Sequence, residues 1–270
     1  MVRIPLLALL GLVLASAVAN AGLSTSFRRT GKVALEVAGA AGGNAPIASG
    51  TLTLSRLPAS ATVLKATLYA SQVNNGAGLS ARFSGVDLGP TGPAASDAVI
   101  QVLYSYEWDV TSLVLPGKLG YTYSVFSGSA IAGVALAVVW EDINEPTRIV
   151  VLVDGMRQVG EIGAETESTS IDDLGHGNTT ISIFTVLDDT INTGEIVAYN
   201  GVGIGGPIDD NLGLLASLLQ LEGESVTGTN TVSIVTGTDH MGWMIAGVSV
   251  TMPSVPVSPT TWTAVKSLFR

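Results

Sequence analysis

The sequence predicts an all-β protein with little helix, built from two tandem β-sandwich units of the jelly-roll kind. Three observations lead to this prediction. Short runs of β-branched residues recur along the chain, turns containing glycine or proline separate them, and the periodicity of amphipathic helices is nearly absent. Many short strands joined by such turns are typical of sandwiches and jelly rolls.

The composition restricts the class of protein further. The chain has 270 residues, of which 47% are apolar and 13% are charged, and it contains two histidines and no cysteine. A chain this apolar can bury a large core, which excludes intrinsic disorder. The formal net charge of −10, with no cluster of Lys or Arg, argues against nucleic acid and anionic membranes as partners. The lack of cysteine excludes thiolate chemistry, disulfide scaffolds and His/Cys zinc sites.

Residues 1–21 have the pattern of a secretory signal peptide. Arg3 supplies the positive charge, an apolar run follows, and the chain then reaches the small-x-small pattern Ala19-Asn20-Ala21. We expect cleavage after Ala21 and a secreted or cell-surface protein. No later stretch has the length and apolarity of a membrane-spanning helix. The most apolar one, Ala130–Trp140, predicts a strand buried on both faces.

The predicted strands follow one another along the rest of the chain. They are Thr51–Leu57, Val63–Ser71, Ala81–Phe83, Ile100–Tyr106, Tyr121–Phe126, Gly133–Trp140, Arg148–Val153, Thr180–Val186, Glu195–Tyr199, Thr231–Val235 and Met244–Met252. Two stretches are compatible with a short helix: Asp109–Val114, with Asp109 as the N-cap, and Leu212–Leu221.

An internal sequence repeat supports the division into two units. Phe83–Gly89 resembles Tyr199–Gly205, and Ile131–Val134 recurs as Ile245–Val248. Both matches have a spacing of about 115 residues, which is close to the usual size of a domain. The predicted divisions are a first unit over residues 22–144, a second unit over residues 145–252 and a proline-rich tail over residues 253–270.

Five short motifs stand in a fixed order along the chain. They are Ala66–Tyr69 (A-x-L-Y), Asp109–Val114 (D-V-T-x-x-V), Val138–Glu141 (V-V-W-E), Asp154-Gly155 (D-G) and Gly228–Val232 (G-x-N-T-V). In this order the chain resembles a family of exported prokaryotic cell-surface β-sandwich domains of unknown function, although Ala70 stands where that family usually has Trp. The resemblance implies an extracellular β-sandwich in an envelope or adhesive protein, with no catalytic residues to carry over.

Two kinds of ligand site can be considered from the sequence. Tyr104, Tyr106 and Trp108 alternate and therefore share one face of a strand, where they form either a platform for a sugar ring or part of the core. Acidic pairs in expected loops offer oxygen ligands for a structural calcium ion, or are simply solvated turn residues. These are Asp172, Asp173, Asp188, Asp189, Asp209 and Asp210.

No catalytic constellation can be identified. Glycosidases use two carboxylates across a cleft, but nothing in the sequence selects a pair among Glu107, Asp109, Glu141 and Asp154. The only histidines, His176 and His240, lie far from any G-x-S-x-G motif. We therefore predict no catalytic residue and no required cofactor.

The sequence favours a structural or adhesive protein of the cell surface or extracellular matrix, acting through self-association as a homo-oligomer or surface polymer. The alternative is a polysaccharide-binding module. An extracellular hydrolase is a third possibility, because sandwiches host all three functions.

Overall fold

The computed structural model describes residues 22–99, 101–160, 165–187, 194–208, 211–213, 215–236 and 240–253. The predicted signal peptide and nearly all of the predicted tail therefore lie outside the described residues. The strands are β1 (Gly22–Gly31), β2 (Val33–Thr53), β3 (Thr62–Val73), β4 (Leu79–Phe83), β5 (Val86–Thr91), β6 (Ala95–Ala98), β7 (Val102–Asp109), β8 (Gly120–Glu141), β9 (Arg148–Val159), β10 (Thr166–Ile171), β11 (Gly177–Val186), β12 (Ile196–Tyr199), β13 (Val202–Gly205), β14 (Ala216–Ser225), β15 (Asn230–Val235) and β16 (Met241–Thr251). The all-β prediction is confirmed.

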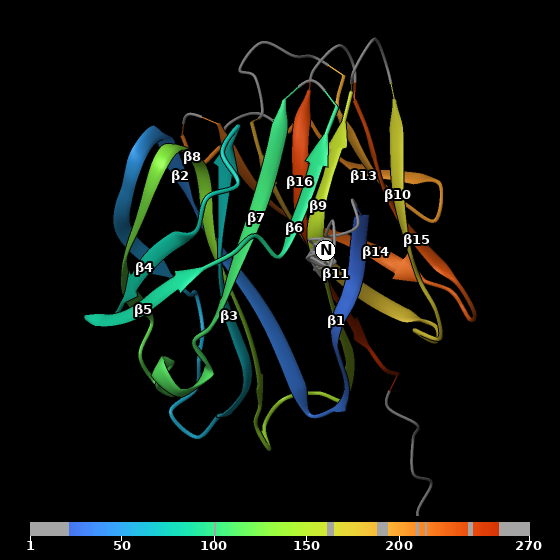
Figure 1. Ribbon diagram of the computed structural model, residues 1–270. Helices are drawn as coiled ribbons and strands as arrows, with labels where there is room; N and C mark the ends of the chain where they lie inside the picture. The colour runs from blue at the N-terminus through green and yellow to red at the C-terminus, as the bar shows by residue number, and fades with distance from the viewer. Residues whose placement is uncertain are drawn as a thin grey trace, which may run out of the picture.

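These strands form three antiparallel sheets (Figure 1). The N-terminal sheet has the order β5-β4-β8-β3-β7-β6, with β2 paired to β8. The central sheet has the order β1-β9-β16-β11-β14, and the C-terminal sheet has the order β10-β15-β12-β13. The N-terminal sheet is built from the first half of the chain. The other two sheets are built from the second half, with the exception of β1, which belongs to the central sheet.

The pairing of β1 differs from the predicted division. Residues 22–31 were expected in the first unit, but β1 pairs with β9 from Gly22↔Met156 to Gly31↔Arg148, at the edge of the central sheet. Pairing with a strand from the second half satisfies the backbone groups of β1 along one side. The duplication of the two units stays a prediction.

The N-terminal sheet folds over its own hydrophobic core. β2 and β8 are 21 and 22 residues long, and their mutual register shifts near Ala41–Ile47, where both strands arch over (Figure 1). The arch encloses a cluster that includes Leu52, Leu68 and Leu136. A second cluster, which includes Val151, Ile183 and Val248, fills the space between the central and C-terminal sheets.

A third cluster joins the two halves. It contains Tyr69, Ala135 and Ala137 from the N-terminal sheet together with Phe184 and Ile245 from the central sheet. On β8 the alternate residues Val134, Leu136 and Val138 belong instead to the cluster inside the arch. The prediction that this strand is buried on both faces is therefore confirmed, and the two halves pack face to face through it.

The two helix predictions had different outcomes. A single 3-10 turn forms at Thr111–Leu113, and its N-cap is Val110, so the prediction of Asp109 as the N-cap is wrong. Asp109 lies one residue earlier, and its Oδ1 accepts the backbone N–H of Thr111 at 2.9 Å. The prediction of a helix over Leu212–Leu221 is wrong, because β14 runs through Ala216–Ser225 and pairs with β11 along its whole length. The ladder of backbone hydrogen bonds to β11 outweighs the local helical preference of the leucines.

Candidate functional site

A polar patch lies on the face of the central sheet that looks toward the N-terminal sheet. Thr180 pairs directly with Ser249, and Ser182 pairs directly with Gln220. Directly opposed residues of antiparallel strands project from the same face. The intervening Ile181 of β11 belongs to the core on the opposite face, so the four polar side chains point toward the interface between the halves.

The opposite wall is formed by β2, which has a strand partner on one side only among the described residues. Leu35 packs so closely on the central sheet that a Cβ added to Gly247 would lie 2.7 Å from its Cδ2. The next residue, Glu36, is buried, and its carboxylate accepts the backbone N–H groups of Ser55 and Arg56. These hydrogen bonds hold the segment after β2 against the strand edge.

An ion-pair bridge connects this segment with β9. The buried carboxylate of Glu145 accepts hydrogen bonds from the guanidinium groups of Arg56 and Arg148, the latter at 2.6 Å. Burial alone would raise the pKa of Glu145, but the hydrogen bonds from the two arginines outweigh it and hold the pKa below its ordinary value. Glu145 therefore stays ionised and balances part of the positive charge of both arginines.

Trp140 of β8 lines the same space. Its side chain is 1% exposed, and the guanidinium carbon of Arg56 lies 5.8 Å from the ring centroid, a cation–π arrangement. The buried indole N–H has no hydrogen-bond partner in the part of the chain that the structure describes. A buried donor without a partner is costly, and because this nitrogen has almost no accessible surface, the N–H is not open to a ligand in this conformation.

Together these elements line a cavity of about 210 Å³, which we call the interface cavity, and it is open to solvent where Thr180 and Gln220 are exposed. Its lining residues are Ala34, Leu35, Glu36, Ser55, Arg56, Trp140, Arg148, Thr180, Ser182, Gln220 and Ser249. A groove of about 500 Å³ adjoins it and shares Glu36, Ser55 and Gln220 with it. The chemistry of the cavity is that of hydroxyl, amide, guanidinium and indole groups, which suits a polar ligand with many hydrogen-bonding groups.

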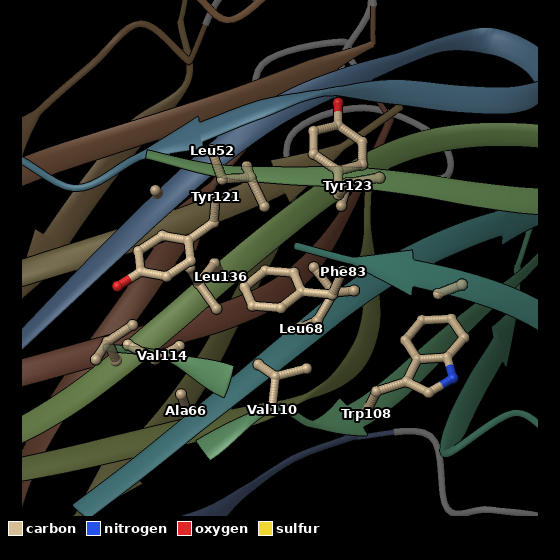
Figure 2. Close-up of a cluster of buried hydrophobic side chains, with 14 of the residues drawn as sticks. Leu52, Ala66, Leu68, Phe83, Trp108, Val110, Val114, Tyr121, Tyr123 and Leu136 are labelled. Atoms are coloured by element: carbon tan, nitrogen blue, oxygen red, sulfur yellow. The ribbon is translucent and has the colours of Figure 1, made fainter. Parts of the chain in front are cut away.

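The structure places the predicted aromatic platform in the core instead. Tyr106 is 0% exposed and Trp108 is 6% exposed, and both belong to the cluster inside the arch, against which the half-buried Tyr104 packs. Figure 2 shows Trp108 at the side of this cluster, near Phe83. An exposed platform is therefore wrong for Tyr106 and Trp108, because β7 turns this face inward as the alternating pattern also allowed.

Of the six predicted calcium ligands, only Asp172 and Asp173 lie within the described residues. Asp188, Asp189, Asp209 and Asp210 lie outside the described residues. Of the remaining pair, Asp172 accepts the Thr229 hydroxyl on Oδ1 at 2.6 Å. The backbone carbonyls of Asp172 and Asp173 both accept hydrogen bonds from the guanidinium of Arg28. Among the described residues, no three His, Asp or Glu side chains are grouped so that they could hold a metal ion.

Two of the four candidate carboxylates are brought together. Asp154 of β9 accepts hydrogen bonds on Oδ2 from Tyr69 and Ser26, each at 2.5 Å, and Tyr69 pairs directly with Glu107 of β7. Burial is the main cause that raises the pKa of Glu107 to about 7, and the nearby negative charge of Asp154 adds to it. The positive charge of Lys65 opposes this rise. Burial also raises the pKa of Asp154, and the hydrogen bonds from Ser26 and Tyr69 offset part of this rise.

The other candidates for catalysis are dispersed. Asp109 forms an exposed ion pair with Lys65, and Glu141 forms one with Arg29. His176 contacts the edge strand β14 through the carbonyl of Ser225, whereas His240 lies 2.6 Å from Gln158. Of the four candidate carboxylates, the structure therefore brings together Glu107 and Asp154.

Sequence reasoning missed the interface cavity. One signal was available: Thr180 and Ser182 alternate with the isoleucines of the predicted strand Thr180–Val186, which places the hydroxyls together on the face opposite to the isoleucines. The contributions of Arg56, Trp140 and Gln220 had no such signal, because the three residues are far apart in the chain.

The fold defines an all-β protein with a polar cavity between two face-to-face halves. Within the described part of the chain, no helix has the length and apolarity needed to cross a membrane. Neither a family model nor a curated protein sequence matches this chain.

Several solved structures are similar to it at low identity. A conserved protein of unknown function from Pseudomonas aeruginosa is 12% identical with a TM-score of 0.31, over 82% of this chain and 100% of that one. A β-porphyranase of glycoside hydrolase family 86 from Bacteroides plebeius is 13% identical with a TM-score of 0.32, over 78% of this chain and 37% of that one. A lectin from Pleurotus ostreatus, solved with GalNAc, is 11% identical with a TM-score of 0.20, over 85% and 80% of the two chains. TM-scores this low carry no argument about function.

Proposed function

We propose that this protein is an exported glycan-binding protein and that the interface cavity is its binding site. The observation that carries the proposal is the polar lining of the interface cavity: three hydroxyls and an amide come from the central sheet, and Ser55 and Arg56 add further polar groups. Sugars present many hydroxyls that donate and accept hydrogen bonds, and binding sites fix such ligands with a few convergent polar groups. The signal-peptide pattern of residues 1–21 supports an extracellular location for this activity.

The first experiment measures binding to a panel of polysaccharides. The protein, expressed from its full sequence, is tested against β-1,4-glucan, β-1,3-glucan, xylan, mannan and galactan, and against alginate and a sulfated galactan as anionic glycans. We expect retention on at least one member of the panel. Gln220→Ala is expected to weaken that binding about tenfold or more, because it removes a hydrogen-bonding side chain from the cavity.

A matched control separates the cavity from the rest of the surface. Ser182→Ala changes a hydroxyl in the cavity, and Ser168→Ala changes an exposed hydroxyl on β10 of the C-terminal sheet. Weaker binding by the first variant and unchanged binding by the second support the proposal. Absence of binding to every member of the panel, or equal effects of the two variants, would overturn it.

Self-association is a second candidate function, and the edges of the central sheet favour it. β14 pairs only with β11 and β1 pairs only with β9, so each strand leaves one side without a strand partner among the described residues. An open edge is a template for strand addition between copies. Light scattering at several protein concentrations, with and without calcium, tests this: growth in mass with concentration supports assembly, and a constant monomer mass refutes it.

A further inference from the structure

The charged groups beside the interface cavity are already engaged within the protein. Glu145 accepts hydrogen bonds from both Arg56 and Arg148. Glu36 uses its carboxylate on two backbone N–H groups of the segment that follows β2. An anionic ligand that took over the arginines would leave the carboxylate of Glu145 buried without them, which is strongly unfavourable. This arrangement favours an uncharged ligand.

The size of the cavity restricts how much of the ligand it encloses. At about 210 Å³ it is smaller than the roughly 300–1,000 Å³ of sites that enclose drug-sized molecules. One sugar ring is therefore the unit that suits this volume. Several hydrogen-bonding side chains at fixed positions on one sheet can orient that ring.

The adjoining groove provides space for a continuing chain. It follows consecutive residues of β2, Glu36–Gly39, and it is also lined by Thr53, Leu212 and Leu218. Leucine side chains offer apolar contacts to the C–H groups of a sugar ring, and Thr53 offers a hydroxyl. The groove shares Glu36, Ser55 and Gln220 with the cavity, so the two spaces adjoin and can hold consecutive units of one ligand.

We infer that the ligand is an uncharged oligosaccharide of at least two sugar units, with one unit in the interface cavity and the next in the groove along β2. This inference rests on the proposed function and specifies its ligand class. It predicts that affinity depends on chain length and that the groove contributes only to the second and later units.

The test uses the polysaccharide retained in the panel experiment. Oligosaccharides of one to six units cut from it are titrated calorimetrically into the protein, together with carboxylated or sulfated counterparts. Thr53→Trp fills the groove without changing a residue that lines the cavity, and Thr51→Trp adds the same bulk at an exposed position outside the groove. We expect a gain of about tenfold in affinity from one unit to two, which corresponds to about 1.4 kcal/mol.

The outcomes distinguish the two proposals. Loss of the chain-length gain in the Thr53→Trp variant, with single-unit binding and the Thr51→Trp variant unchanged, supports the inference. Binding that does not depend on length, that is unaffected by Thr53→Trp or that favours the anionic counterparts overturns the inference while the glycan-binding function stands. Absence of binding to every glycan overturns the proposed function itself.

Discussion

Replacing Glu107 by Gln is expected to remove a pH dependence from the stability of the protein. Glu107 lies on β7, directly paired with Tyr69, whose hydroxyl donates to Asp154 across the interface between the two halves. Its pKa is raised from 4.5 to about 7, first by burial and then by the charge of Asp154. Between about pH 4.5 and pH 7, Glu107 therefore stays protonated in the folded protein, whereas in the unfolded chain it loses its proton.

The sign and size of the effect follow from this shift. Because the folded-state pKa is the higher one, the stabilisation is fully present below about pH 4.5 and is lost as the pH rises through about 7. A shift of this size corresponds to about 3.4 kcal/mol at 1.36 kcal/mol per unit. Glu107 is only partly buried, and solvent screening reduces the expected loss to about 2 kcal/mol.

Urea denaturation at pH 4 and pH 8.5 measures this contribution. The wild-type protein is expected to lose about 2 kcal/mol more than the Glu107→Gln variant between the two pH values. Glu222→Gln, at an exposed carboxylate on β14, serves as the control and should follow the wild type. Parallel pH profiles of the wild type and the Glu107→Gln variant would refute the reasoning.

Three further changes test the packing of the fold by chemical denaturation. Trp108→Ala should cost about 3–5 kcal/mol, because the ring is buried in the arch; a loss near zero would restore the surface platform. Tyr69→Phe removes a donor from the buried carboxylate of Asp154 and should cost about 1–3 kcal/mol, with unchanged stability contradicting the hydrogen bond. Gly42→Ala would place a Cβ 2.2 Å from a carbonyl oxygen of β8 and should cost about 1–3 kcal/mol, whereas Gly92→Ala, with no atom within 4 Å, should cost less than about 0.5 kcal/mol. Equal effects of the two glycine changes would contradict the tight arch.

Local sequence patterns were sufficient to predict the structure of a strand where the residues of that strand alone determine its conformation and burial. The continuous apolar run of Ala130–Trp140 predicted a strand buried on both faces, and residues 131–140 are all buried. The same local reasoning failed for Leu212–Leu221, because the pairing of β14 with β11 decides the structure there. For Tyr106 and Trp108, alternation showed a shared face but not whether that face meets solvent or core.

The pairing of Glu107 with Asp154 was beyond such reasoning for a related reason. Among the acidic residues, nothing in the sequence selected Glu107 and Asp154, which become neighbours only because β7 and β9 meet where the two halves pack. The raised pKa of Glu107 depends on that burial, and burial is a property of the packed sheets.

The sequence by itself determined the all-β class of this protein, because β-branched alternation and glycine- and proline-containing turns act over a few residues and leave little choice of local structure. The tertiary structure alone decided that β1 joins the central sheet and that a polar cavity forms between the halves. That cavity combines side chains from β2, β8, β9, β11, β14 and β16, including Trp140 and Gln220. Contacts between residues so distant in the chain depend on which sheet faces pack together, and the local pattern of each strand does not contain that information.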